Sequence, residues 1–299
     1  MINHPASGPG GDLPPGPDAV PGAGARAGST PVAPLPPELA DPARTLFGDR
    51  FPLAAAYAEL LATDGVLRGL VGPREASRIW ARHLLNCAPV AELIPVGCSV
   101  LDVGSGAGLP GIVLAVARPD LSIVLVEPLA RRTAFLVEVV AALDLARSVT
   151  VLRARAEELA GNPGTVTRSP GGRPAVGTGP AGEPGDLVLP ADIVTARAVA
   201  PLDRLAAWCL PLTAPGGRLL ALKGASAADE VAEHADAVGR LGGSAPIVRR
   251  CGVGVLDPPT TVVEIVRERV VGVPRAPSSR SAGVRRAANP PRRGRTPRR

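Results

Sequence analysis

The stretch VLDVGSGAGLPG, residues 100–111, decides the fold class of this 299-residue chain. A short apolar strand runs directly into a loop with four glycines, and the residues that follow, LPGIVLAVA, have the composition of a helix. A glycine-rich loop between a strand and a helix is typical of folds that bind a nucleotide cofactor, because glycine lets the backbone approach the ligand closely. The loop therefore predicts a cofactor site at the end of the first strand of a sheet.

The glycines of this loop fit two cofactor patterns. Gly106, Gly108 and Gly111 spell the G-x-G-x-x-G pattern of dinucleotide-binding loops. Asp102, Gly104 and Gly106 instead spell the loop of enzymes that bind S-adenosyl-L-methionine. The Asp102 carboxylate would repel a pyrophosphate, whereas it could orient the loop or the ammonium group of the methionine part. We therefore expect S-adenosyl-L-methionine as the cofactor, with a dinucleotide-dependent oxidoreductase as the alternative.

Strand and helix segments alternate along the chain after this point. The strand segments are expected at residues 99–103, 123–127, 149–152, 191–197, 214–224, 247–252 and 261–266. The last two fit an antiparallel hairpin, whose turn contains the DPPT sequence at residues 257–260. This order predicts an α/β fold, the Rossmann-like class I methyltransferase fold, with a mostly parallel seven-stranded sheet and helices on both faces.

Two helical segments precede the first strand and predict an N-terminal helical extension. Residues 46–61 are interrupted by Pro52, and residues 73–88 form an amphipathic stripe. The stripe consists of Ile79, Trp80, His83, Leu84 and Cys87. His83 is interpreted as a core histidine of this stripe, with a functional role as the alternative.

Both ends of the chain and one internal segment depart from the pattern. Residues 1–40 are rich in Pro, Gly and Ala, lack a signal peptide and are expected to be a disordered tail. Residues 41–271 are expected to form the methyltransferase domain, interrupted by a low-complexity insertion loop at residues 161–190. Residues 272–299 are expected to form a second disordered tail, with nine arginines and no acid.

The basic character of the chain comes from this second tail. The whole chain has a net charge of +6 and a pI of about 10.0, whereas the residues before the tail sum to a negative charge. An Arg-rich tail suits loose contact with phosphates, and the alternative is a solvated tail without a dedicated partner. The four cysteines and three histidines show no metal-ligand spacing, and no run of about 18 apolar residues predicts a membrane span.

Charged residues follow three further strands, at the sheet edge where parallel sheets bind their ligands. Glu127 closes the second strand, and its two carboxylate oxygens can accept both ribose hydroxyls. Ala156 and Glu157 follow the third strand, where the adenine edge would lie. Arg197 closes the fourth strand and is expected to hold the target phosphate or the cofactor carboxylate, with a surface arginine as the alternative.

Seven motifs resemble one enzyme family in their order along the chain. They are RHLLN (82–86), DVGSGAGLPG (102–111), RPD (118–120), EPLARRTAFL (127–136), RAEEL (155–159), TARAVAPLDRL (195–205) and ALKG (221–224). Together they resemble the ribosomal RNA small-subunit methyltransferase G family, also called glucose-inhibited division protein B, over about residues 53–266. The two tails and the insertion at 161–190 fall outside the resemblance.

The resemblance implies an activity, a partner and a set of contacts. The activity is transfer of a methyl group from S-adenosyl-L-methionine to N7 of a guanine in the decoding-centre loop of 16S rRNA, position 527 in the usual count. The partner is 16S rRNA or the small ribosomal subunit, in the cytoplasm, with the enzyme as a monomer and without metal or membrane. The implied cofactor contacts are Gly104, Leu109, Ala156, Glu157 and Arg197.

No catalytic acid or base is expected, because guanine N7 is a lone pair without a proton and its methylation depends mainly on positioning. Four basic residues are candidates for RNA contact: Arg82, Arg131, Arg132 and Lys223. Arg131 and Arg132 open a helix, where a cation is electrostatically unfavourable, so a phosphate contact would explain them. A solvated first turn is the alternative. Lys223, the only lysine of the chain, ends the fifth strand.

Overall fold

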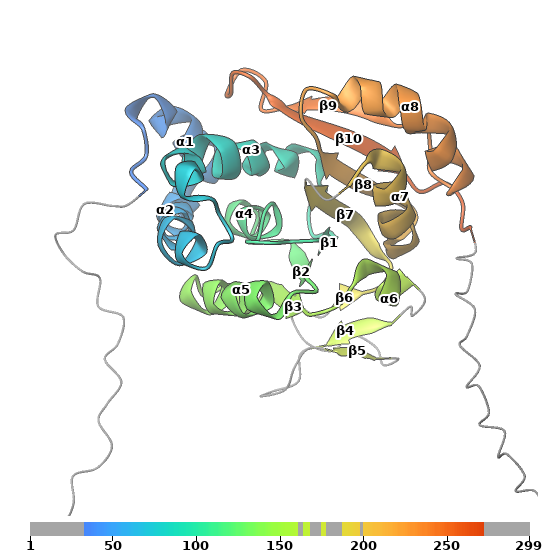
Figure 1. Cartoon of the computed structure of the whole chain (residues 1–299), viewed down its shortest axis with the longest axis horizontal. Coiled ribbons are helices and arrows are strands. Elements are labelled where there is room, and N and C mark those ends of the chain that lie inside the picture. The colour runs from blue at the N-terminus through green and yellow to red at the C-terminus, as the bar shows by residue number, and fades with distance from the viewer. Residues whose placement is uncertain (1–32, 161–163, 168–174, 178–186, 198–199, 272–299) are drawn as a thin grey trace, which may run out of the picture. The chain divides into compact units, whose positions relative to one another are not determined.

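A seven-stranded sheet forms the centre of the structure (Figure 1), a computed structural model that describes residues 33–160, 164–167, 175–177, 187–197 and 200–271. The strand order is β3-β2-β1-β7-β8-β10-β9. All pairs from β3 to β8 are parallel, whereas β10 pairs with β8 and β9 in antiparallel register. The strands are β1 Ser99–Val103, β2 Ser122–Val126, β3 Val149–Leu152, β7 Ala191–Arg197, β8 Thr213–Leu222, β9 Ile247–Cys251 and β10 Thr260–Val266. The predicted mostly parallel seven-stranded sheet and its closing hairpin are confirmed.

Helices cover both faces of the sheet (Figure 1). One face packs against α4 (Gly111–Ala117), α5 (Ala130–Ala142) and the N-terminal helices, and the other against α6 (Ala156–Ala160), α7 (Leu202–Cys209) and α8 (Ala227–Arg240). Side chains alternate between the two faces, so that Val100 and Ile123 belong to one apolar core and Leu101 and Val124 to the other. Because both faces are buried, the parallel strands are mostly apolar, and the buried polar side chains of Asp102 in β1 and Thr195 in β7 bind each other.

The N-terminal extension begins earlier than the sequence predicted. Pro37–Leu39 forms a 3-10 turn that leads into α1 (Ala40–Phe47), and Ala33 is only 7% exposed. The Ala33 carbonyl accepts a hydrogen bond from the Trp80 indole, with an N···O distance of 3.1 Å. The predicted end of the N-terminal tail at residue 40 is therefore wrong, because a Pro- and Ala-rich composition hides a segment whose order comes from contacts with distant residues.

The extension then runs through several short helices before β1. The break expected at Pro52 lies just before it, at the 3-10 turn Gly48–Arg50, and Pro52 itself occupies the first turn of α2 (Phe51–Leu60), where its missing N–H costs little. The remaining short helices are Leu61–Gly65, Pro73–Arg78, Trp80–Leu84, α3 (Leu85–Cys87) and Ala88–Leu93.

The segment at residues 161–190 contains strands where the sequence predicted only a loop. β4 (Thr165–Thr167), β5 (Ala175–Gly177) and β6 (Leu187–Val188) form a small antiparallel sheet in the order β5-β4-β6. Val166 is fully buried, so this sheet contributes to the core. Its short valine-containing strands were hidden by the surrounding Gly and Pro. The Arg-rich tail and residues 1–32 lie outside the described residues.

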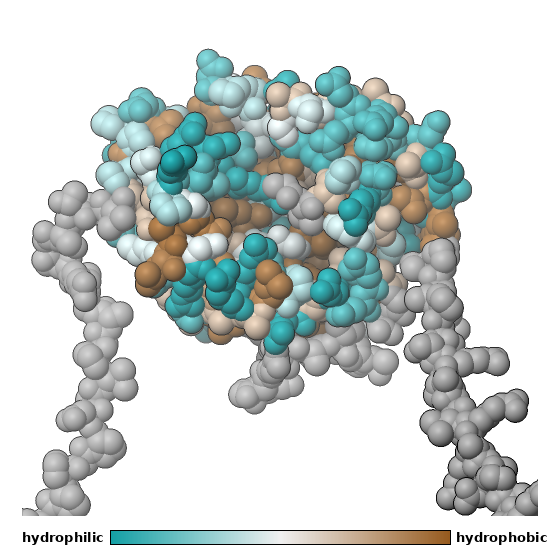
Figure 2. All heavy atoms as spheres, in the orientation of Figure 1, coloured by the Kyte–Doolittle hydropathy of each residue, from teal (hydrophilic) through white to brown (hydrophobic). Residues whose placement is uncertain are grey.

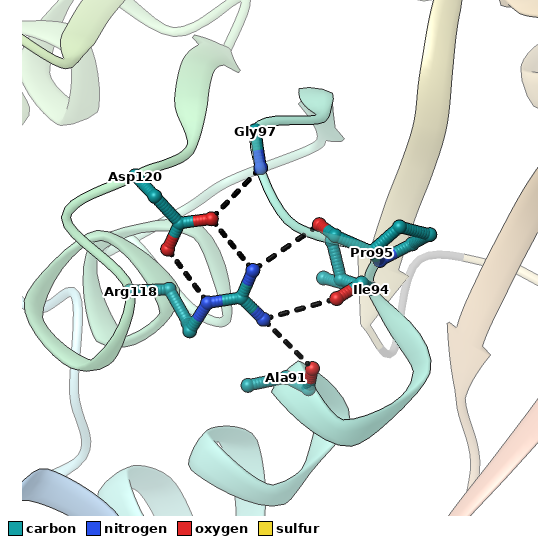
Figure 3. A network of polar contacts seen from close by, with 6 residues as sticks. All are labelled: Ala91, Ile94, Pro95, Gly97, Arg118 and Asp120. Carbon is teal, nitrogen blue, oxygen red and sulfur yellow. Dashed lines mark hydrogen bonds and ion pairs between the residues drawn. The ribbon is translucent and has the colours of Figure 1, made fainter.

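A polar network closes the amino-terminal edge of the sheet (Figure 3). Arg118, directly after α4, donates to both carboxylate oxygens of Asp120, each at 2.7 Å, and to the carbonyls of Ala91, Ile94 and Pro95 at 3.0–3.2 Å. Asp120 also accepts the Gly97 N–H at 2.9 Å, and the Arg118 guanidinium lowers the pKa of Asp120 to about 2. This network ties the last N-terminal helix to the loops that enter β1 and β2.

The surface over α8 is mostly hydrophilic (Figure 2). No helix among the described residues is both long enough and apolar enough to cross a membrane.

Candidate functional site

Two cavities open at the carboxyl ends of the parallel strands. The first, which we call the loop cavity, measures ≈ 630 Å³ and is lined by residues 104–107 and Leu109 of the glycine loop, by Glu127 and by His83. The second, the hairpin cavity, measures ≈ 800 Å³ and lies among the N-terminal helices, the end of β8 and the β9–β10 turn. Arg197, at the end of β7, lines both cavities, so the two share a wall.

The first half of the glycine loop faces the loop cavity. Gly104 and Gly106 have φ angles of +71° and +59°, which side chains rarely adopt. The N–H groups of Gly104 and Ser105 donate to the Val126 carbonyl at 2.9 and 3.1 Å, so the loop folds back over the end of β2. These glycines therefore shape the backbone that borders the cavity.

The second half of the loop packs against the protein itself. A Cβ at Gly111 would collide with the Leu125 side chain and lie 2.8 Å from an Asp102 oxygen, and a Cβ at Gly108 would lie 2.9 Å from the Tyr57 hydroxyl. Tyr57 in turn donates to the Ala107 carbonyl at 2.7 Å. Gly108 and Gly111 are thus explained by internal packing, and the G-x-G-x-x-G frame needs no dinucleotide.

Asp102 lies beneath the loop rather than in the cavity. Its carboxylate is fully buried and accepts hydrogen bonds from the Thr195 hydroxyl at 2.8 Å and the Gly111 N–H at 3.2 Å. Burial raises its pKa to about 6. The carboxylate therefore sits at the start of α4, where a dinucleotide would place its pyrophosphate. The contacts of Asp102 show that it orients the loop, whereas its predicted contact with the cofactor stays a prediction.

Glu127 closes β2 at the border of the loop cavity and is only 1% exposed. One carboxylate oxygen accepts the Gly106 N–H at 3.0 Å, and the other accepts the Leu129 N–H at 2.9 Å. Arg132 places a guanidinium nitrogen 3.7 Å from the first of these oxygens. Glu127 thus holds the glycine loop against the end of β2, and each oxygen keeps acceptor capacity for one more donor.

Arg197 reaches from β7 to the N-terminal helices. Its guanidinium donates to the Cys87 sulfur at 3.1 Å, to the Arg82 carbonyl at 3.1 Å and to Nδ1 of His83 at 2.7 Å. A guanidinium carries five N–H donors. Three of the Arg197 donors have partners among the described residues, and the residue itself lines both cavities.

His83 is a site residue that the sequence did not assign. Because Nδ1 accepts from Arg197, the imidazole is neutral and carries its proton on Nε2, which lies 3.5 Å from Glu75 without a well-aligned hydrogen bond. Burial, followed by the nearby Arg197 charge, lowers its pKa to about 4. The apolar stripe explained its burial, but its partner lies 114 residues away in the chain, so no local pattern could indicate this contact.

Comparison with known proteins identifies the family. The family model described as "rRNA small subunit methyltransferase G" matches residues 51–168 and 183–253. A protein of Salinispora tropica named ribosomal RNA small subunit methyltransferase G is 68% identical over 252 residues, which cover 84% of this chain and 96% of that protein. The protein of the same name from Streptomyces avermitilis is 49% identical over 262 residues, covering 86% and 99%.

The chain belongs to the rRNA small subunit methyltransferase G family. The predicted family, enzyme class and cofactor, S-adenosyl-L-methionine, are confirmed, and membership in a methyltransferase family replaces the oxidoreductase alternative. Among solved structures, cofactor-bound Rv0187 from MTB aligns with a TM-score of 0.46 and 17% identity, over 79% of this chain and 99% of that chain. Mitomycin 7-O-methyltransferase MmcR aligns with a TM-score of 0.44 and 20% identity, over 77% and 66%.

The other contacts implied by the family resemblance divide into two groups. Leu109 lines the loop cavity with Gly104 and Gly106. Ala156 and Glu157 stand in the first turn of α6, where Ala156 is buried and Glu157 is exposed, and the cavity wall there is formed by the preceding Arg155 instead. The adenine contacts predicted at Ala156 and Glu157 therefore stay a prediction.

The four candidate RNA contacts differ in their exposure and in whether an ion pair within the protein already occupies their charge. Arg131 is exposed in the first turn of α5, and Arg132 borders the loop cavity. Arg82 is half-exposed, although it forms an ion pair with Glu75 at 3.0 Å. Lys223 is the least available, because its ammonium is 9% exposed and bound to Glu230 at 2.6 Å and to the Ala200 carbonyl at 2.8 Å.

The four cysteines are free thiols, and no group of three or more metal-ligating side chains gathers anywhere in the described part of the chain.

Proposed function

We propose that the protein transfers a methyl group from S-adenosyl-L-methionine to N7 of a guanine in the decoding-centre loop of 16S rRNA, position 527 in the usual count. The proposal rests on the family match over residues 51–168 and 183–253. It also rests on the cavity at the glycine loop, which Glu127 and Arg197 line.

The residues of the loop cavity fit the cofactor. When bound, the cofactor supplies an electrophilic methyl group on a positively charged sulfur. The backbone of Gly104 and Gly106 would border its methionine part, and the remaining Arg197 donors would receive its carboxylate. Glu127 would accept the ribose hydroxyls through the acceptor capacity that its two loop contacts leave.

The chemistry requires positioning rather than proton transfer. The N7 lone pair forms the new N–C bond while the C–S bond breaks and its electrons stay on sulfur, so the positive charge moves to the guanine and no proton leaves. No general base is needed, and the neutral imidazole of His83 is free to serve as an acceptor for Arg197. An arginine held at the wall between the two cavities is well placed to align cofactor and base, and alignment supplies most of the rate in such reactions.

The proposed binding of RNA rests on three arginines that are exposed or half-exposed. Arg82, Arg131 and Arg132 would contact phosphates around the cofactor cavity, which adds affinity and makes binding depend on salt. Lys223 contributes least to this surface because Glu230 already neutralises it. We further propose 16S rRNA or the small ribosomal subunit as the partner, the cytoplasm as the location and a monomer as the working form.

The test is a map of the methylated nucleotide. Small ribosomal subunits from cells that lack the gene are incubated with the purified protein and S-adenosyl-L-methionine, and N7-methylguanine is located by chemical cleavage at that base. We expect one new cleavage site, in the decoding-centre loop, that also returns in cells complemented with the gene. Methylation of a different RNA, or of a different atom of the same guanine, would contradict the proposal.

A further inference from the structure

The hairpin cavity has no role in the cofactor site described above. It is built from three separate parts of the chain: Ala81 and Asn86 of the N-terminal helices, Gly224 after β8, and the turn that contains Asp257. Its volume of ≈ 800 Å³ lies in the range of small-molecule sites. Because Arg197 forms a wall of both cavities, a group in the hairpin cavity would lie next to the cofactor.

Two of its lining residues leave the space open. Gly224 is exposed and has an ordinary φ, and a Cβ added there would meet nothing within 4 Å. Neither the backbone nor the packing of the protein therefore requires glycine at this position. Ala81, which lines the cavity from the N-terminal helices, is also exposed. Small side chains at both places keep open a cavity that larger ones would fill.

The lining also matches the chemistry of a purine. Leu85 and Leu256 offer apolar contacts to the flat faces of a base. Asn86 and Asp257 offer oxygen acceptors, and the edge of guanine opposite N7 carries the N1–H and N2–H donors. Arg197 offers N–H donors on the side of the cofactor, where O6 of guanine accepts a hydrogen bond next to N7. An adenine would place its N6 amino group there, so that this donor would face the N–H donors of Arg197 without an acceptor between them.

We propose that the hairpin cavity receives the target guanine of the RNA, turned out of its stack, with N7 toward the wall that Arg197 forms. This inference rests on the proposed methylation of rRNA and names the site that holds the base. Many base-modifying enzymes turn the target base out of its stack so that it enters a pocket beside the reacting group.

The test fills the cavity without touching the cofactor cavity. Ala81→Trp and Gly224→Leu add bulky side chains to its lining from two separate segments of the chain, and neither residue lines the loop cavity. Gly224 also lines a neighbouring cavity beside α8, whereas Ala81 does not, so Ala81→Trp is the more selective variant. Ala134→Trp and Gly239→Leu are matched controls, because Ala134 is exposed on α5, Gly239 has open space for a Cβ, and neither lines either cavity. The readouts are the thermal midpoint, the Kd of S-adenosylhomocysteine and kcat/KM with small ribosomal subunits.

We expect each filled variant to lose more than about 100-fold in kcat/KM, with the Kd of S-adenosylhomocysteine changed less than about twofold, while both controls behave like the wild type. Wild-type methylation by both filled variants would overturn the inference and leave the proposed function intact. A parallel loss of S-adenosylhomocysteine binding would also overturn it, because the hairpin cavity would then belong to the cofactor. An inactive wild type would instead contradict the proposed function itself.

Discussion

Two arginines at opposite edges of the sheet differ in how completely their donors are used. Arg118, at the amino-terminal edge, directs all five N–H groups to Asp120 and to three backbone carbonyls (Figure 3). Arg197, at the carboxyl-terminal edge, has partners for three of its five donors within the described residues. Both side chains bridge the sheet to the N-terminal helices, so their position in the fold alone does not distinguish them.

The difference separates a residue that holds the fold from one that is ready for a ligand. Arg197 is half-exposed and lines two cavities, so its remaining donors can exchange water for a ligand at a small cost in free energy. At the amino-terminal edge every donor of Arg118 is bound within the protein, whereas at the carboxyl-terminal edge Arg197 lines two cavities that a ligand could enter. Substitutions at the two edges should therefore affect different measured quantities.

The largest effect is expected for Arg197→Ala. The variant loses the donors that face both cavities, and we expect kcat/KM for ribosomal subunits to fall about 1,000-fold, equivalent to ~4 kcal/mol. Arg197→Lys should restore little of this, because three donors on a single nitrogen cannot reproduce the planar fork. Steady-state methylation and the Kd of S-adenosylhomocysteine are the measurements. A loss of less than about tenfold for Arg197→Ala would remove the distinction between the two arginines.

Arg118→Ala should change stability and leave the chemistry intact. The partly buried carbonyls of Ala91 and Ile94, the exposed carbonyl of Pro95 and the Asp120 carboxylate lose their donor. We therefore expect the free energy of unfolding to fall by about 3 kcal/mol in urea titrations at pH 7. The kcat/KM of the folded variant, measured well below its unfolding midpoint, should stay within about twofold of the wild type. A selective loss of activity without a loss of stability would show that the amino-terminal edge also takes part in function.

The sequence predicted the order of the strands and helices. It did not predict the contacts that distinguish Arg118 from Arg197. Most strands of the sheet contain an apolar run bounded by helix or turn signals, so element order and topology followed from local pattern. The position of Gly104, Gly106 and Glu127 at the loop cavity was also predictable, because they follow strands whose carboxyl ends meet at one edge.

The contacts of the two arginines depend on tertiary structure instead. The carbonyl partners of Arg118 lie 23 to 27 residues earlier, and the His83 partner of Arg197 lies 114 residues away. The hairpin cavity combines three distant segments, and the contact of Ala33 with Trp80 spans 47 residues. Periodicity describes what one segment buries, and it carries no information on which distant segment covers it.

Glu127→Ala tests a second residue at the carboxyl-terminal edge of the sheet. Glu127 supports the glycine loop and is the proposed acceptor for the ribose, so we expect S-adenosylhomocysteine to bind more weakly by about 1.5–3 kcal/mol in calorimetry. Glu268→Ala is the matched control, because this exposed glutamate does not line the loop cavity and is not a predicted cofactor contact, and its effect should stay below about 0.5 kcal/mol. Equal losses in both variants would contradict the proposed contact between Glu127 and the ribose.

The smallest effect concerns the neutral imidazole that supports Arg197. In the folded protein the pKa of His83 is lowered to about 4 from 6.5, so the unfolded chain binds more protons between these pH values. Its contribution to stability is therefore complete above pH 6.5 and is lost as the pH falls to about 4. Asp102 acts in the opposite direction over a similar window, because its pKa is raised to about 6 and the folded state binds the extra proton.

His83→Gln separates these two contributions. The glutamine side-chain oxygen can still accept the Arg197 N–H, but it does not titrate. We expect the wild type to lose about 1–2 kcal/mol more stability than the variant when urea unfolding is compared at pH 6.5 and pH 4, because only the wild type must protonate an imidazole 2.7 Å from a guanidinium. His83→Leu, which lacks an acceptor, should in addition lose about tenfold in kcat/KM at pH 7.5, whereas His83→Gln should keep most activity. Identical pH dependence in wild type and His83→Gln would mean that the pKa of His83 is the same in the folded and unfolded states, which would contradict a neutral imidazole held as the acceptor of Arg197.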